Sequence, residues 1–200
     1  MHKNFLTRRF LIGLMFALPM AIGCNNETKP SPSPAAEQAK PRIRVGVPMV
    51  LSGASAQFGT PIVKGMQMLV DEENAKGGVL GRQIELIIRD TKLKPDEAVR
   101  VSRELIERES VDFLVGSFTS AEAPAVSVIA KENKILLVVP GAKTIQLTDE
   151  KNIHPYVVRV APTTDIEGRS AATMMAKLPV KRIATIVPDY AYGRDIVDSF

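Results

Sequence analysis

The sequence of 200 residues has no tryptophan, one cysteine and two histidines. A single cysteine excludes an internal disulfide, and Cys24 with His2 and His154 is too sparse a set for a cysteine-rich zinc site or a Cys/His catalytic pair. We therefore expect no metal ion and no cofactor. The apolar share of 45% and the charged share of 24% are those of a soluble globular protein. The length predicts one domain, or one domain and the beginning of a second.

The basic surplus lies at the front of the chain. The net charge is +4, but three of the 26 basic side chains precede Cys24 with no acidic residue beside them. Residues 25–200 therefore contain 23 basic and 22 acidic side chains, a net charge of +1. We therefore expect no nucleic-acid partner, because the folded part carries no basic excess.

Residues 1–24 have the pattern of a lipoprotein signal peptide. Basic residues precede an apolar run at 10–22, which as a helix spans only about 20 Å of a hydrocarbon core roughly 30 Å thick. A buried core helix is the structural alternative. Cys24 follows small residues, as in a bacterial lipobox whose thiol is acylated, although Ala21 stands where leucine is usual. The Arg-Arg pair also resembles part of a twin-arginine signal, so the export route stays open.

Residues 25–41 contain four prolines, two serines and no large apolar side chain. Such a segment has too little apolar surface to fold, and it predicts a disordered tether with a reach of roughly 20 to 50 Å. The expected location is the periplasm or the cell surface, with the membrane contacted only through the lipid anchor.

From residue 42 on, short β-branched runs alternate with amphipathic stretches, which predicts βαβ units and a doubly wound parallel α/β sheet. The expected strands are 42–47, 83–89, 111–115, 135–139, 156–160 and 183–187. The expected helices begin at Pro61 behind a Thr60 cap, at Pro95, at Ser120, at Asp165 and near Gly193. The last helix stops at Phe200 before it can complete its packing, so we expect the chain to be a fragment.

Three unusual loops follow predicted strands, at 48–59, 116–122 and 140–144. Ligands of open parallel sheets bind at the carboxyl ends of the strands, so these loops are the candidate site. Ser120 at a helix start is suited either to binding a carboxylate or simply to capping the helix, and spacing alone leaves both readings open.

Enzyme motifs are incomplete, and we expect no enzymatic activity. The Gly141-to-Thr144 segment lacks the first glycine of a phosphate-binding loop, and residues 116–120 lack the glycines of a nucleophile elbow. His154 precedes a proline in a polar turn, which predicts a surface histidine with no nucleophile to serve.

Several short motifs occur in a specific order: Leu51-Ser52-Gly53 with Ala56-Gln57-Phe58-Gly59, Asn74-Ala75-Lys76-Gly77-Gly78-Val79, Pro140-Gly141-Ala142 with Leu147-Thr148, and Asp189-Tyr190-Ala191-Tyr192-Gly193. From residue 43 to 200 the chain thereby resembles the leucine/isoleucine/valine-binding family of ABC-transporter substrate-binding proteins, which have the type I periplasmic binding protein fold. The resemblance implies two α/β lobes that close on a small ligand, with residues 42–161 as lobe one and 162–200 as the truncated start of lobe two.

The resemblance also implies a function and a set of ligand contacts. The function is that of a solute receptor for an amino acid or similar small polar molecule, with an ABC permease and its ATPase as partners; a ligand-sensing module of a signalling receptor is the alternative. Ser120 and the backbone near Lys143 would meet the ligand carboxylate, and the carbonyl of Gly141 its ammonium. The full expected set is Phe58, Thr119, Ser120, Gly141, Ala142, Lys143, Tyr190 and Tyr192.

Two departures from the family pattern affect specificity. Lys143 stands where relatives usually have serine or threonine, and its ammonium would repel an α-ammonium but favour an extra carboxylate. The acidic residue that pairs with the ligand ammonium in relatives would lie beyond Phe200. We therefore expect these 200 residues alone to bind ligand weakly or not at all.

Overall fold

The computed structural model describes residues 40–200, so the predicted signal peptide, Cys24 and most of the predicted tether lie outside the described residues. Five strands form one sheet in the order β2-β1-β3-β4-β5, and every neighbouring pair is parallel. The predicted doubly wound α/β class is confirmed. The strands are β1 (Ile43–Met49), β2 (Ile84–Asp90), β3 (Phe113–Val115), β4 (Leu137–Val139) and β5 (Val157–Arg159).

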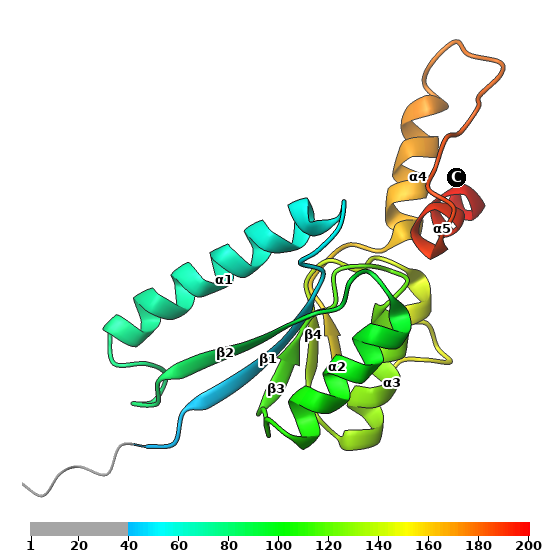
Figure 1. The fold of residues 1–200 in the computed structure, drawn as a ribbon. Coiled ribbons are helices and arrows are strands. Elements are labelled where there is room, and N and C mark those ends of the chain that lie inside the picture. Colours follow the sequence, from blue (N-terminus) through cyan, green and yellow to red (C-terminus); the bar gives the residue numbers. More distant parts are fainter. Residues whose placement is uncertain (1–39) are drawn as a thin grey trace, which may run out of the picture. The chain divides into compact units, whose positions relative to one another are not determined.

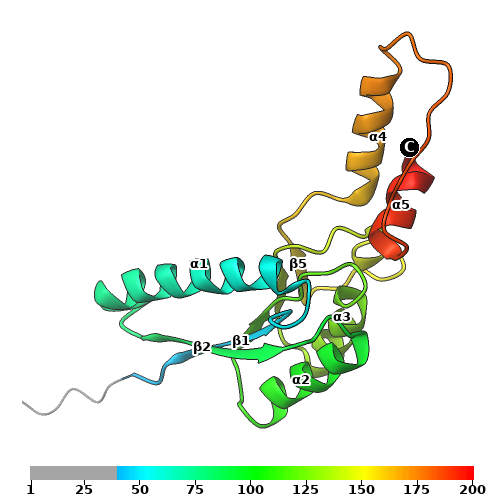
Figure 2. The ribbon, with the colours of Figure 1, turned by 45° about the horizontal axis from the view of Figure 1, so that its top comes forward.

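Helices cover both faces of this sheet. Figure 2 shows α1 on one side of the sheet and α2 and α3 on the other, and in Figures 1 and 2 α4 and α5 lie side by side. In residues 40–200 no helix combines the length and the apolarity that crossing a membrane requires. The helices are α1 (Ala56–Ala75), α2 (Pro95–Glu107), α3 (Ala123–Asn133), the 3₁₀ turn η1 (Ile145–Leu147), α4 (Thr164–Met175) and α5 (Ala191–Ser199).

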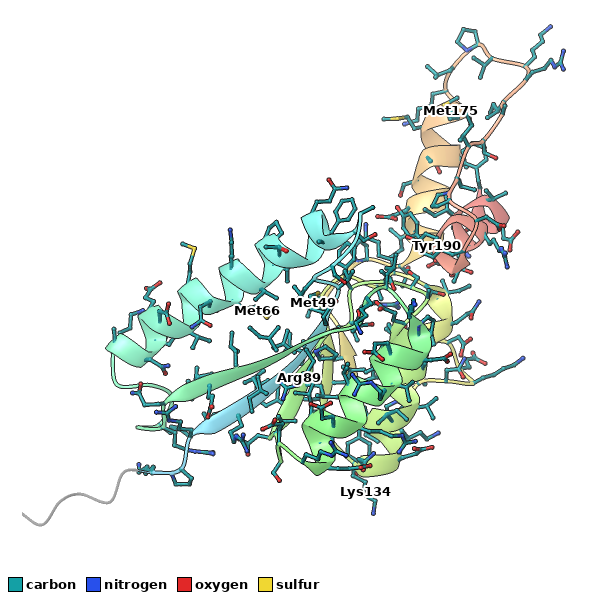
Figure 3. All side chains as sticks on the ribbon, viewed as in Figure 1. Met49, Met66, Arg89, Lys134, Met175 and Tyr190 are labelled. Atoms are coloured by element: carbon teal, nitrogen blue, oxygen red, sulfur yellow. The ribbon has the colours of Figure 1, made fainter. Side chains whose placement is uncertain are left out.

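The core has two layers. Between the sheet and α2 and α3, side chains such as Leu105, Leu114 and Leu137 are completely buried. Between the sheet and α1, Met49 of β1 packs with Met66 of the helix, and Figure 3 labels both. These layers fix the sheet, so the loops at its carboxyl edge are held on a rigid base.

The first helix begins earlier than predicted. It starts at Ala56, whose N–H donates to the Gly53 carbonyl at 3.2 Å, and Pro61 lies inside it. Proline has no N–H to give to the carbonyl four residues back, but that carbonyl belongs to the exposed Gln57 and can be solvated. The prediction of a loop through Gly59 with a Thr60 cap was therefore wrong.

The strand predicted at 183–187 does not form. Figure 1 shows this segment within the loop that joins α4 to α5, and Ile186 is fully exposed. The segment hydrogen-bonds to none of β1–β5, and a strand without a ladder is not stable. The helix near Gly193 does form, but it begins two residues earlier, at Ala191.

Candidate functional site

A cavity of about 540 Å³ lies where the carboxyl ends of β3 and β4 meet α5. Seven of the eight predicted binding residues line it; the exception is Ala142, which is buried in the core beneath. The prediction missed two further lining residues, Phe118 and Pro140, although both lie in loops that the sequence had marked. The full lining is Phe58, Phe118, Thr119, Ser120, Pro140, Gly141, Lys143, Tyr190 and Tyr192.

Ser120 does not cap α3. The helix begins three residues later, at Ala123, and the Ser120 Oγ instead accepts the N–H groups of Lys143 at 3.2 Å and Thr144 at 3.1 Å. Of the two readings of Ser120, the capping one was wrong. Because its oxygen already accepts two hydrogen bonds, the hydroxyl proton is the group left to interact with a ligand, and it donates.

Thr119 presents a hydrogen-bond acceptor to the cavity, whereas Ser120 presents a donor. Its hydroxyl donates to Glu122 Oε2 at 2.8 Å, and the Glu122 side chain is completely buried. The other oxygen of Glu122 has no hydrogen-bond partner among the described residues. Since the Thr119 proton is directed at Glu122, only its lone pairs remain for the cavity, so Thr119 can accept but not donate there.

Lys143 reaches the cavity as half of an ion pair. Its Nζ donates to Glu167 Oε1 of α4 and lies 5.9 Å from the centre of the Tyr192 ring. The hydrogen bond to Glu167 raises the pKa of Lys143 above its usual 10.5, although partial burial acts in the opposite direction. Lys143 is therefore protonated at neutral pH, and its charge is already opposed by a carboxylate.

Aromatic rings form much of the remaining lining. Phe58 from α1 stacks on Phe118 with ring centres 5.6 Å apart, and Tyr190 stacks on Tyr192 at 6.1 Å. Figure 3 shows Tyr190 at the end of α5 nearest the sheet. Burial raises the pKa of both tyrosines above 10.0, so both phenols are neutral near pH 7.

A buried carboxylate fixes α5 to the loop after β4. Asp195 of α5 is 8% exposed and its Oδ2 accepts from Thr144 Oγ1 and, at 3.3 Å, from Thr164 Oγ1 at the start of α4. The Lys143 carbonyl also accepts the Thr164 N–H at 2.9 Å. These bonds position α5, and with it Tyr190 and Tyr192, against the segment that carries Lys143.

His154 is buried, so the prediction of a surface histidine was wrong. Its Nε2 lies 2.8 Å from Ser127 Oγ, while its Nδ1 accepts the Tyr156 N–H at 3.2 Å. In the neutral ring Nε2 must then carry the proton and donate to Ser127. The histidine thus cannot take the serine proton, and the pair is structural.

Metal-binding groups are also lacking in the part of the chain that the structure describes. No cluster of three or more histidine, cysteine or acidic side chains suited to a metal ion occurs within residues 40–200. The cavity offers hydroxyls, one ammonium group and aromatic rings, which are groups that can orient and contact a small ligand.

Comparison with known proteins identifies the family. Residues 42–200 match the family described as periplasmic binding protein. The chain belongs to this family. Among the relatives, a Leu/Ile/Val-binding protein, BraC3, from Rhizobium johnstonii is 33% identical over 159 residues, which are 79% of this chain and 42% of that protein. The resemblance to leucine/isoleucine/valine-binding proteins is thereby confirmed.

Solved structures agree with this assignment. The LivJ protein of Streptococcus pneumoniae, determined with isoleucine, is 30% identical with a TM-score of 0.69 over 79% of this chain and 45% of its own. A solute-binding protein of an ABC transporter from Rhodopseudomonas palustris, determined with 3,4-dihydroxybenzoic acid, is 28% identical with a TM-score of 0.68 over 79% and 42%. The chain spans less than half the length of these periplasmic binding proteins.

Proposed function

We propose that this protein is the extracytoplasmic solute receptor of an ABC importer and that it binds an amino acid or similar small polar molecule between two lobes. The observation that carries the proposal is the cavity at the carboxyl edge of the sheet, where Ser120 and Lys143 present donors. The relatives with Leu/Ile/Val-binding names and the isoleucine complex of LivJ support an amino-acid ligand.

The binding residues divide between two groups of elements. Ser120, Gly141 and Lys143 belong to residues 42–161, which we propose as lobe one; the Ser120 hydroxyl would donate to a ligand carboxylate and the Gly141 carbonyl would accept from an ammonium. Tyr190 and Tyr192 belong to residues 162–200, the proposed start of lobe two. A ligand that contacts both groups favours the closed arrangement, and a difference of a few kcal/mol suffices to shift the population.

The cellular setting completes the proposal. Residues 1–24 would direct export, acylated Cys24 would anchor the chain, and residues 25–41 would act as the tether. An ABC permease with its ATPase would recognise and bind the closed receptor, and no nucleic acid would be involved. The sensing alternative makes a different prediction: deletion of the gene would abolish a ligand-dependent response and leave uptake of labelled ligand unchanged.

The test is calorimetric titration of the full gene product with L-leucine, L-isoleucine and 3,4-dihydroxybenzoate, the last because one relative was solved with it. We expect dissociation constants in the micromolar range for at least one probe. Ser120→Ala should weaken that binding by roughly tenfold to a hundredfold, since hydrogen bonds to charged groups contribute about 1.5–3 kcal/mol. Ser170→Ala, on the exposed side of α4, is the matched control. Absence of binding, or equal effects of the two variants, would contradict the proposal.

A further inference from the structure

The aromatic residues are distributed unevenly. Of the seven aromatic residues in residues 40–200, four line the one cavity described above. Two of them are not occupied with core packing, since Phe58 is 52% exposed and Tyr190 37% exposed. An adjoining cavity of about 290 Å³ is lined by Phe58, Phe118 and Tyr190 as well. Large exposed apolar rings grouped at a cavity indicate a surface that a ligand covers.

The ring geometry favours a flat partner. Within each stacked pair the two rings are close to parallel, with an interplanar angle of 11° between Phe58 and Phe118 and of 28° between Tyr190 and Tyr192. Each pair comes from a different part of the fold, α1 and the loop after β3 for one and the start of α5 for the other. Stacking is available to a planar ring, whereas a branched aliphatic side chain obtains only apolar contact from the same surfaces.

The polar lining favours a carboxylate. Ser120 donates and Lys143 is cationic, so an anionic oxygen finds partners, while no carboxylate side chain lines the cavity among the described residues. Glu167 accepts from Lys143 and the buried Glu122 accepts from Thr119, and neither acid lines the cavity. Thr119 faces the cavity as an acceptor, which suits a hydroxyl substituent on the ring.

We infer that the ligand class of this site is an aromatic monocarboxylate, with its ring on the Phe and Tyr faces and its carboxylate at Ser120 and Lys143. The inference rests on the proposed function and narrows it. The direct probe is a matched pair of acids that differ in aromaticity, benzoate and cyclohexanecarboxylate, titrated into the full gene product beside 4-hydroxybenzoate, L-leucine and L-isoleucine.

We expect benzoate and 4-hydroxybenzoate to bind at least tenfold more tightly than cyclohexanecarboxylate. Tyr190→Leu should reduce that preference by about two- to tenfold, the range that a stacked ring contributes beyond its area, while Tyr190→Phe retains it. Phe118→Leu provides a second test from the other ring pair. Thermal unfolding of each variant verifies that it is folded.

The outcomes separate this inference from the proposed function. If L-leucine or L-isoleucine binds more tightly than every aromatic acid, and Ser120→Ala weakens it, the receptor function stands and the aromatic class is wrong. If cyclohexanecarboxylate equals benzoate, the rings act only as apolar surface and the inference also fails. If the folded protein binds no probe, the receptor function itself is contradicted.

Discussion

Asp195→Ala tests how α5 is held beside the site. The carboxylate is the acceptor for the hydroxyls of Thr144 and Thr164, which are both completely buried. Removing it leaves two buried donors without that acceptor, and each such group costs about 1–3 kcal/mol. We therefore expect the free energy of unfolding to fall by roughly 2–6 kcal/mol. Both hydroxyls donate to the same oxygen, Oδ2, and Asp195→Asn retains one acceptor oxygen, so its loss should be smaller than that of Asp195→Ala.

Urea titration followed by far-ultraviolet circular dichroism measures this loss, and hydrogen exchange of the α5 amides reports whether the helix is released locally. Asp198→Ala on the same helix is the control, because Asp198 is exposed and its removal should change stability by less than about 0.5 kcal/mol. A double-mutant cycle with Thr164→Val should show coupling. Equal losses for the Asp195 and Asp198 variants, or strictly additive effects in the cycle, would refute the assigned role of Asp195.

Two further predictions concern stability. Burial, with a smaller effect from a nearby lysine, lowers the pKa of His154 below 6.5 in the folded state, so the unfolded state binds the proton more tightly. The free energy of unfolding should therefore be constant above pH 6.5 and fall as the pH drops below it. Urea titrations of wild type and His154→Gln between pH 8 and about 5 should show that this pH dependence is lost in the variant. Gly59→Ala should destabilise the protein by roughly 1–3 kcal/mol because its Cβ would lie 1.8 Å from the Val50 carbonyl oxygen. Gly65→Ala in the same helix meets nothing within 4 Å and should stabilise the protein by about 0.5–1 kcal/mol. If thermal unfolding shows that both variants shift the melting temperature in the same direction, the close packing of Gly59 on Val50 is contradicted.

The sheet was predictable because its determinants are local. β-branched runs such as 135–139 can be read from the sequence, and the βαβ alternation then dictates parallel pairing. The run at 183–187 is also rich in β-branched residues but has no neighbouring strand among residues 40–200, and composition does not contain that information. Pro61 was taken as a helix start because proline is common there, yet it is also tolerated where the freed carbonyl faces solvent.

The site was predictable as a set of loops but not as a pattern of hydrogen bonds. The motifs around Phe58, Ser120 and Gly141 identified segments that line the cavity, and the parallel sheet brought them to one edge. The partner of each polar group is decided by contacts distant in sequence: Ser120 with Lys143, 23 residues later, and Thr144 with Asp195, 51 residues later. No local signal marks those pairs, and the same holds for the buried pair of His154 and Ser127.

Lys143 shows what such a distant contact changes. From the sequence alone its ammonium would repel the ammonium of an amino acid, and Lys143→Thr would be expected to move the preference toward apolar amino acids. In the structure Glu167 opposes that charge, so the repulsion is weaker than a free lysine would exert, and Lys143→Thr would leave a partly buried carboxylate unpaired. That carboxylate would attract an ammonium by itself. The double variant Lys143→Thr with Glu167→Gln is therefore the one that removes both charges, and only its selectivity reports how much the lysine contributes to ligand choice.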